Sequence, residues 1–403
     1  LAAAKSAYDA GERDIVILER QSELGGILNQ CIHNGFGLHT FKEELTGPEY
    51  ASRYIVEVQK RGIEYKLDTT VLSISNSKVV TAVNETDGLI KYQSKAVIVA
   101  CGCRERPRGG INVAGSRCAG IFSAGTAQKL INIDGYMPGK EVVILGSGDI
   151  GLIMARRMTF EGAKVKAVVE LMPYSSGLNR NIVQCLKDFD IPLLFSHTVV
   201  DIKGEGRVSS VVIAQVDEKL NPIMSTAQEI KCDTLLLSIG LVPEKELAEK
   251  AGVKVSPVTG GAVVDEGMMT SVEGIFECGN VLHVHDLVDF VSKESEDAGA
   301  SAVRYIQQGI MPDGKVSIVG EDGVRYVVPQ YLSKSARLDK LQLKMRVSNV
   351  FKNKRLVAEI DGEEVLSKKK QIVTPGEMES IVLTGEQIKR IQKGERLTLR
   401  LKD

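Results

Sequence analysis

The sequence predicts an α/β fold of two units, in which parallel strands alternate with helices, followed by a small β-rich domain. Residues 141–170 run from an apolar segment through a glycine-rich turn and a helix-period segment into a second apolar segment that ends at an acid. Residues 2–19 repeat the second half of that pattern. Beyond residue 314, alternation of apolar and polar residues takes its place.

The glycine-rich turn is Gly146-Ser147-Gly148-Asp149-Ile150-Gly151, directly after the apolar run at 142–145. In such a turn the first glycine permits the tight bend, the second lets a pyrophosphate approach, and the third lets the helix pack closely. Glu170 follows about twenty residues later, where an acid accepts hydrogen bonds from an adenosine ribose. A bare packing turn is the alternative, but the strand–turn–helix–strand context favours a Rossmann-like dinucleotide site.

The acid also bears on which dinucleotide binds. A carboxylate at Glu170 would repel a 2′-phosphate, so the sequence favours NAD(H) over NADP(H). The nearby Arg180 weakens this preference because a guanidinium attracts a phosphate.

Composition narrows the class of protein. A chain of 403 residues is long enough for two or three domains. Its 51 basic and 52 acidic residues give a net charge of −1, so it has no field that would attract nucleic acid or an anionic membrane. No apolar run is long enough for a membrane span. Seven cysteines without a CxxC pair favour a reducing cytoplasm over a disulfide framework or a structural zinc site. We therefore expect a cytoplasmic protein that acts on a small molecule.

The beginning of the chain resembles half of a second nucleotide unit. A helix-forming segment ends at Gly11, an apolar strand covers 14–18, and Glu19 stands where Glu170 stands in the central motif. The preceding strand and glycine turn are missing, so we expect that the chain starts inside the first helix of that unit. A natural start at a lone helix and strand is the alternative, although it would leave the edge of a parallel sheet unpaired.

The remaining elements follow in order. We expect helices at 47–61, 121–132 and 287–308, and strands within 63–92, 95–100, 199–216, 233–239, 262–265 and 274–280. Alternation predicts further strands at 341–347, 356–360 and 397–401. The pattern divides the chain into a discontinuous first domain (1–107 and 244–312), a second nucleotide domain (108–243) and a β-rich C-terminal domain (320–403).

Two acid-tipped nucleotide units, the segments AVIVACG and LLLSIG, and TSVEGIFECGN before a long helix resemble the flavoprotein pyridine nucleotide-disulfide oxidoreductase superfamily. Within it, the sequence is most similar to the NAD(P)/FAD-dependent oxidoreductases related to the α-subunits of sarcosine and opine oxidases. Proteins of that type are often associated with an FAD-dependent glycerol-3-phosphate dehydrogenase. The resemblance covers roughly residues 1–310. It implies an FAD-dependent NAD(P)H oxidoreductase with FAD and NAD(H) as cofactors.

The resemblance also implies site residues. The predicted FAD contacts are Glu19 and Arg20 at the adenosine ribose, Gly25 and Gly26 near the isoalloxazine, Val71 at the adenine, Ala100, Cys101 and Gly102 on the adenosine side, Gly279 and Asn280 at the ribityl chain and pyrophosphate, and His285 and Asp286 before the long helix. The superfamily usually has Asp at the position of Asn280, so that contact loses a charge. The predicted NAD contacts are Gly146, Gly148, Asp149, Ile150, Gly151, Glu170, Ile239 and Gly240.

The segment His283-Val284-His285-Asp286 also allows an interpretation as metal ligands. We expect no metal, because the sequence shows no third and fourth ligand nearby.

No dithiol is visible at either position where this superfamily carries one. Ser123-Ala124-Gly125-Thr126 stands at the place of the CxxC motif, and the other region holds only Cys31. A dithiol relay needs two thiols within bonding reach. Cys101 and Cys103 are two residues apart, at a place that matches the turns on the adenosine side in this superfamily, so we expect them to be structural.

The hypothesis is therefore a flavoprotein that passes a hydride between NAD(H) and FAD. Electrons would then go to, or come from, a partner dehydrogenase subunit docked partly through the β domain, or a small substrate. One alternative is a peroxide or disulfide reductase that uses Cys31 alone. A second is a non-catalytic assembly subunit. A homo-oligomer is a further expected arrangement of the chain.

Overall fold

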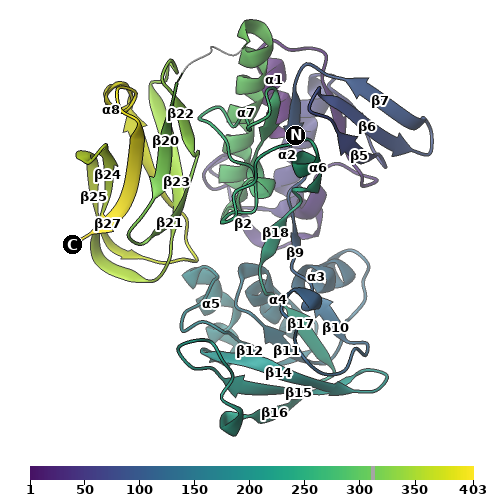
Figure 1. Ribbon diagram of the computed structural model, residues 1–403. Helices are drawn as coiled ribbons and strands as arrows, with labels where there is room; N and C mark the ends of the chain where they lie inside the picture. Colours follow the sequence, from purple (N-terminus) through teal and green to yellow (C-terminus); the bar gives the residue numbers. More distant parts are fainter. Residues whose placement is uncertain (310–313) are drawn as a thin grey trace. The chain divides into compact units, whose positions relative to one another are not determined.

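The computed structural model describes residues 1–309 and 314–403, and the chain divides into two compact units. Unit 1 comprises Leu1–Asn29, Asn34–Cys103 and Pro243–Asp403, and unit 2 comprises Gln30–His33 and Arg104–Val242. Both are labelled by their elements in Figure 1. The C-terminal segment belongs to unit 1. The three domain boundaries given by the sequence stay a prediction, and the predicted end at residue 312 lies outside the described residues.

Unit 2 is built on a five-stranded parallel sheet in the order β10-β17-β11-β12-β13. Alternate residues of β11 enter two cores, with Val142 and Ile144 packed against the helix α4 and Val143 and Leu145 on the other face. Burial on both faces explains why these strands are continuous apolar runs. The strands are β10 (Ile121–Ser123), β11 (Glu141–Leu145), β12 (Lys164–Val169), β13 (Leu193–Leu194) and β17 (Thr234–Leu237).

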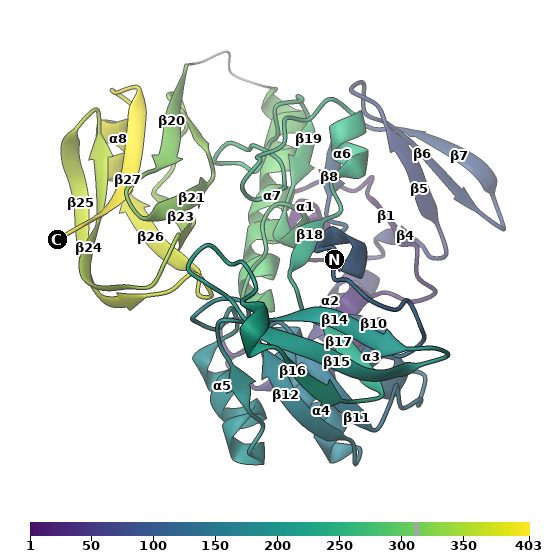
Figure 2. The same ribbon diagram turned by 60° about the horizontal axis from the view of Figure 1, so that its bottom comes forward.

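Three helices and an antiparallel sheet complete unit 2, as Figure 2 shows. The helices are α3 (Ala124–Asn132), α4 (Asp149–Phe160) and α5 (Asn179–Cys185), with 3₁₀ turns η2 (Arg108–Gly110), η3 (Lys187–Phe189) and η4 (Met224–Thr226). The antiparallel strands are β14 (His197–Gly204), β15 (Val208–Gln215) and β16 (Gln228–Lys231).

Two sequence predictions in unit 2 were inaccurate. The strand expected at 199–216 is a hairpin of β14 and β15, because its apolar run is interrupted at 205–207. The helix expected from residue 121 begins at Ala124, because the three residues before it pair with β17.

The first part of unit 1 contains two separate parallel pairs, β1 (Val16–Leu18) with β4 (Glu64–Lys66) and β8 (Val97–Val99) with β19 (Ile275–Glu277). The helix α1 (Ala2–Asp9) packs on α7 (Val288–Gln308), where a Cβ at Gly299 would lie 2.2 Å from the Ala3 carbonyl oxygen. These small residues permit the close helix packing.

The other elements of this part are short, except for α2. The helix α2 (Gly47–Lys60) begins with a capping box between Thr46 and Glu49, and it is where the sequence predicts a helix. The expected strand at 262–265 was wrong, because this segment makes only an isolated bridge between Val255 and Ala262. The remaining elements are β2 (Asn34–Phe36), β3 (Leu45–Thr46), β5 (Thr70–Ile74), β6 (Val79–Asn84), β7 (Gly88–Gln93), α6 (Glu246–Lys250) and η5 (Gly279–Val281). Three more elements, η1 (Gly26–Gln30), β9 (Cys103–Glu105) and β18 (Leu241–Pro243), each include a boundary between the two units.

The C-terminal part of unit 1 consists of two sheets around one apolar core, with strand orders β22-β20-β27-β24-β25 and β21-β23-β26. The strands predicted at 341–347, 356–360 and 397–401 are confirmed, because they lie within β23, β24 and β27. The short helix α8 (Gly385–Ile391) was not predicted. The strands are β20 (Lys315–Gly320), β21 (Val324–Val328), β22 (Tyr331–Ser333), β23 (Lys340–Val347), β24 (Phe351–Ile360), β25 (Glu363–Val373), β26 (Glu379–Thr384) and β27 (Arg396–Lys402).

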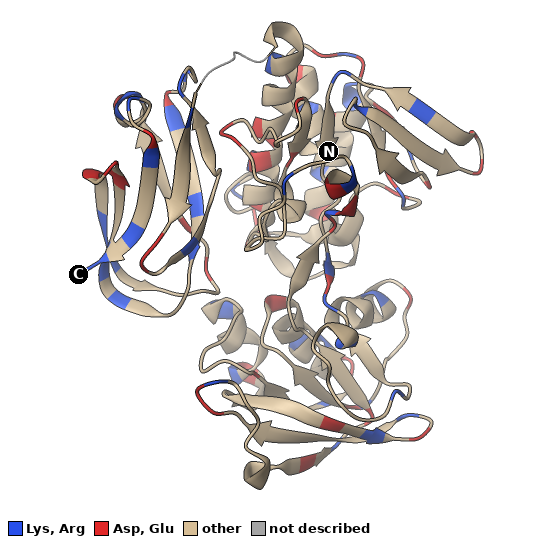
Figure 3. Cartoon of the chain, in the orientation of Figure 1, with Lys and Arg blue, Asp and Glu red and all other residues tan. Residues whose placement is uncertain are grey.

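Lysines and arginines occur on several strands of this C-terminal part (Figure 3). Two of them, Lys344 and Arg346, lie on β23 and bind acids of the α7 region. Within residues 1–309 and 314–403, no helix is both long and apolar enough to cross a membrane.

Candidate functional site

The glycine-rich turn of unit 2 connects β11 to α4. Gly146 has φ +93°, and a Cβ there would lie 2.1 Å from the Ser238 carbonyl oxygen. A Cβ at Gly151 would lie 2.6 Å from the Cβ of Ser238. The first position thus requires glycine for backbone conformation and space, and the third for helix packing. The turn has the geometry that the nucleotide fingerprint demands.

Glu170 stands at the end of β12 and is only 5% exposed. Its Oε2 accepts hydrogen bonds from Ser147 N (2.9 Å) and Ser147 Oγ (2.5 Å), and its Oε1 accepts from Met172 N (2.8 Å). A carboxylate has about four acceptor positions, so roughly one remains for a ribose hydroxyl. Glu170 therefore braces the turn itself, a role for Ser147 that the sequence did not indicate.

A following segment covers the same turn. Ser175 Oγ donates to Ser147 O (3.2 Å), and Ser176 N donates to Ser147 Oγ (3.2 Å). Asp149 accepts at Oδ1 from Leu178 N (2.8 Å) and from Asn181 Nδ2 (2.6 Å). The Asp149 carboxylate is thus held by hydrogen bonds at the N-terminus of α4, where a negative charge is favourable.

The other predicted NAD residues lie at the same edge of the sheet. Ile239 and Gly240 follow β17, which is the neighbour of β11, and β11 is flanked on its other side by β12. The carboxyl ends of these three parallel strands bring Gly146, Glu170 and Ile239 to one edge. The side chain of Ile150 packs partly into the core, and Gly240 O accepts from Arg106 N at 2.9 Å. Arg180 is exposed on α5.

In unit 1, hydrogen bonds connect Glu19 to the start of β5. Glu19 O accepts from Thr69 N (2.9 Å), and Glu19 Oε1 accepts from Gln21 N (2.9 Å). Val71 is two residues past Thr69, so the two predicted adenosine contacts lie in hydrogen-bonded segments. Arg20 is exposed beside them. Gly25 and Gly26 follow with φ +117° and +59°, conformations that favour glycine.

The segments around β8 and β19 come together in the same way. Cys278 N donates to Val99 O (3.2 Å), so Ala100, Cys101 and Gly102 leave the sheet beside Gly279 and Asn280. Ala100 and Cys101 are exposed. Cys101 Sγ donates to Glu244 O (3.2 Å), in keeping with the structural role expected for it.

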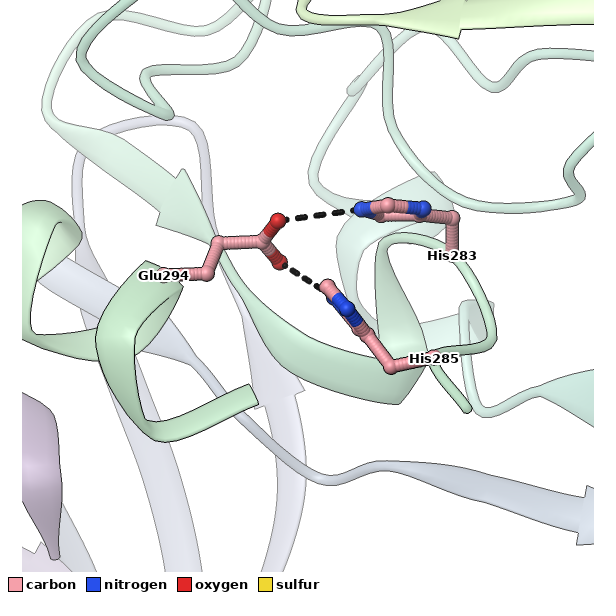
Figure 4. A group of neighbouring side chains, drawn as sticks. All are labelled: His283, His285 and Glu294. Atoms are coloured by element: carbon pink, nitrogen blue, oxygen red, sulfur yellow. Dashed lines mark hydrogen bonds and ion pairs between the residues drawn. The ribbon is translucent and has the colours of Figure 1, made fainter. Parts of the chain in front are cut away.

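His283, His285 and Glu294 form a buried cluster (Figure 4). Glu294 lies between the two imidazoles, with 2.9 Å from its Oε2 to His283 Nε2 and 3.1 Å from its Oε1 to His285 Nε2. The expectation of no third ligand near His283 and His285 was wrong, because Glu294 lies two turns into α7 and faces back toward them. The three groups have the types and spacing of metal ligands.

Lys344 bears on whether this cluster would bind a metal. Its Nζ lies 2.6 Å from Glu294 Oε2, so the carboxylate already has a positively charged partner. A divalent ion would have to displace this ammonium. The cluster is therefore better described as a buried hydrogen-bonded network than as a metal centre.

Two predicted flavin contacts have protein partners in this structure. His285 is part of the buried network, and Asp286 binds Arg346 through Oδ1 and accepts from Met378 N at Oδ2 (2.6 Å). Their contact with FAD stays a prediction. Asp289, in the first turn of α7, accepts from Gly37 N (3.2 Å) and Thr40 N (2.7 Å), which the sequence did not indicate.

Cys31 belongs to unit 2, where it contacts α3. Its Sγ lies 3.8 Å from Gln128 Oε1, and Gln30 Nε2 donates to the same oxygen at 2.9 Å. Burial raises the pKa of the Cys31 thiol to about 12. All seven cysteines lie in the described part of the chain, and none of them is in a disulfide.

A parallel sheet with a glycine turn and an acid-tipped strand in unit 2, and a second acid-tipped set of nucleotide-type segments in unit 1, define an oxidoreductase of the two-dinucleotide class. The chain belongs to the pyridine nucleotide-disulphide oxidoreductase family, whose model matches residues 1–297. Members of this family use FAD and NAD(P)H, which agrees with the expected oxidoreductase class, while the activity of the whole protein and the choice of NAD(H) stay proposals.

Three similar proteins illustrate the range of this family. The NAD(P)H sulfur oxidoreductase (CoA-dependent) of Pyrococcus abyssi is 27% identical over 266 residues, 64% of this chain and 55% of that protein. The hydrogen cyanide synthase subunit HcnB of Pseudomonas aeruginosa is 22% identical over 238 residues, 55% of this chain and 49% of that protein. The chain spans about half the length of these curated relatives.

The crystal structure of T. acidophilum thioredoxin reductase matches with a TM-score of 0.62 and 24% identity, covering 75% of this chain and 93% of that one. This match confirms the predicted α/β fold class. None of these three proteins is named as a sarcosine or opine oxidase, so they give no support to a glycerol-3-phosphate dehydrogenase association.

Proposed function

We propose that the protein is an FAD-dependent oxidoreductase that exchanges a hydride with NAD(H). The observation that carries the proposal is the turn from Gly146 to Gly151, in which the closeness of Ser238 leaves no room for a Cβ at either glycine. This is the arrangement that lets a pyrophosphate approach the main chain at the start of a helix.

The nucleotide specificity follows from Glu170. Its buried carboxylate keeps one acceptor position beside the turn, which suits a ribose hydroxyl and repels a 2′-phosphate. Arg180 is exposed on α5, and its guanidinium weakens this preference because it attracts a phosphate. The proposal is therefore that NADH is preferred to NADPH.

When bound, FAD and NAD(H) supply the two-electron chemistry of hydride transfer. The residues of this chain bind and orient them. In unit 1, Glu19, Val71, Ala100–Gly102 and Gly279–Asn280 would hold the flavin nucleotide. The N-terminus of α7 follows this set in the sequence, and its partial positive charge would stabilise the negative charge of a reduced flavin bound beside it.

A separate part of the proposal concerns the molecule that exchanges electrons with the flavin. The sequence has no cysteine pair at either position where the superfamily carries a dithiol, so we propose direct transfer to or from a small substrate or a partner dehydrogenase subunit. HcnB, a relative, is named as a subunit of a synthase, which supports the partner arrangement. Two other proposals for the partner remain. One is a glycerol-3-phosphate dehydrogenase, which the sequence resemblance implies, and the other is a second copy of this chain.

A sulfur or disulfide reductase that uses Cys31 is the second candidate. The similarity to an NAD(P)H sulfur oxidoreductase favours it. The raised pKa of Cys31 is against it, because the thiolate is the nucleophile in such reactions. Replacing Cys31 by Ser should abolish turnover under this second proposal and leave NADH oxidation largely intact under the first.

The visible absorption spectrum of the purified protein, before and after anaerobic NADH, tests the main proposal. A flavin band that bleaches with NADH would establish both nucleotide sites, and a weaker response to NADPH would establish the specificity. A protein that stays colourless after incubation with FAD would contradict the proposal and favour the assembly-subunit alternative.

A further inference from the structure

The carboxylate of Glu294 is the centre of a buried network in unit 1. The residue is 1% exposed and accepts four hydrogen bonds, two at each oxygen. Gly279 N (2.8 Å) and His285 Nε2 (3.1 Å) donate to Oε1. His283 Nε2 (2.9 Å) and Lys344 Nζ (2.6 Å) donate to Oε2. Every acceptor position of the carboxylate is therefore in use.

Lys344 is the positively charged member of this network. Burial lowers the pKa of His283 to about 4, so its imidazole is neutral near pH 7. Burial also opposes ionisation of Glu294, but His283, His285 and Lys344 hold its pKa well below the usual value. A buried carboxylate without a counter-charge would instead take up a proton. The ammonium of Lys344 is the cation in direct contact with it.

The network reaches the predicted flavin loop through two bonds. Gly279 N donates to Glu294, and Asn280 Oδ1 accepts from His285 N at 3.0 Å. Gly279 has φ +74°, and a Cβ there would lie 3.0 Å from Val291 Cγ1 of α7. Gly279 is thus bonded to the carboxylate of Glu294 itself, and Asn280 is bonded to the main chain of His285, whose side chain contacts the same carboxylate.

Lys344 comes from a different part of the chain than the other members. It lies on β23 of the C-terminal β domain, 50 residues from Glu294, whereas the rest belong to residues 279–294. Arg346, on the same strand, binds Asp286, and Met378 N donates to that carboxylate as well. The β domain therefore meets the loop region with buried charge and hydrogen bonds, rather than through apolar packing alone.

We infer that Lys344 is a positioning residue for the flavin loop: the C-terminal β domain supplies the charge that keeps Glu294 in place on Gly279. The flavin part of this inference rests on the proposed function. The inference gives the β domain a task in cofactor binding, for which its sequence shows no site of its own.

The test compares two lysines of the β domain in the full-length protein. Lys344→Met removes the buried charge. Lys315→Met is the matched control, because Lys315 also pairs with an acid of the first part of unit 1, Asp265 at 3.3 Å, but its side chain is 41% exposed and does not touch Glu294. The readouts are FAD affinity from flavin fluorescence and amide hydrogen exchange at Gly279.

Lys344→Met should weaken FAD binding at least about tenfold and accelerate exchange at Gly279, since breaking a buried ion pair leaves an uncompensated charge. Lys315→Met should stay within about twofold of the native protein in both. Adding Glu294→Gln to Lys344→Met should restore part of the loss, because it removes the orphaned carboxylate and keeps an acceptor. A role in packing alone would not be rescued by that second change.

Native affinity and native exchange at Gly279 in Lys344→Met would overturn the inference. If Lys344→Met does not fold, the double variant decides: folding of the double variant supports the charge role, and its failure overturns it. If the native protein binds no FAD, the proposed function fails. Exchange at Gly279 then still decides the role of Lys344.

Discussion

The reactivity of Cys31 separates the two proposed functions. Burial raises the pKa of this thiol from 9.0 to about 12. At a pH below both values, a shift of about three units lowers the thiolate fraction about a thousandfold. Because the thiolate is the form that attacks, alkylation of Cys31 in the folded protein should be slower by about that factor than in the unfolded chain.

The measurement is the rate of iodoacetamide labelling at pH 8, followed by peptide mass spectrometry for Cys31 alone. The same chain in urea supplies the reference rate, so the chemistry and the neighbouring sequence are identical. Limited access of the reagent would also slow labelling, but it would not alter the pH at which the rate rises. In the folded protein the rate should therefore still rise about tenfold between pH 9 and pH 10, where the rate of the unfolded reference begins to level off.

Labelling of the folded protein at the reference rate, with a plateau below pH 8, would refute this reasoning. Cys31 would then be a low-pKa thiol, and the sulfur reductase would become the better supported function. The hydrogen bond from its thiol to Gln128 would in that case have to be replaced by contacts that stabilise a thiolate.

Three further predictions follow from the structure. Gly146→Ala should abolish bleaching by NADH and, in urea unfolding, lower the free energy of unfolding by more than the roughly 1–2 kcal/mol of left-handed strain. The control is Gly162→Ala, which should show the strain alone, because Gly162 has φ +85° and no atom lies within 4 Å of its Cβ. Burial raises the pKa of Glu277 from 4.5 to about 7, so the proton it binds stabilises the fold below pH 4.5, and this contribution is lost as the pH rises to 7. Glu277→Gln should remove that slope and add about 3 kcal/mol at pH 8; an unchanged pH profile of urea unfolding would count against it. Ser147→Ala removes the 2.5 Å bond to Glu170 and should cost about 1–3 kcal/mol and raise the NADH concentration needed for bleaching, both checked against the native protein.

The sequence was most informative where the chemistry is local. The spacing of Gly146 and Gly151 identified a turn in which both glycines are required by their closeness to a single residue, Ser238. The helix α8 was missed although Thr384 and Gln387 form a capping box, a signal that is visible in the sequence. The start of α3 was misplaced because pairing with β17, more than 100 residues away, determines that Ile121–Ser123 is a strand.

The buried network could not be predicted in the same way. His283 and His285 could be recognised as a pair from the sequence. No pattern in the sequence indicated that Glu294 lies between them, or that Lys344 of a distant strand binds Glu294. Such contacts depend on how two parts of the chain pack, and they leave no periodic pattern. A lysine in an alternating strand is expected to be solvated, so its burial was not foreseen.

The two nucleotide-type turns are held by buried acids in physically different ways. Glu170 binds Ser147 and Met172, which are neutral donors within unit 2, whereas Glu294 binds Gly279 with the charge of Lys344 beside it. Loss of that charge should therefore affect the flavin side and leave the NAD side as it is. In Lys344→Met, NADH affinity measured by nicotinamide fluorescence should match that of the native protein while FAD affinity falls. A parallel loss of both would mean that the substitution acts on the whole fold, and that the β domain has no selective effect on the flavin loop.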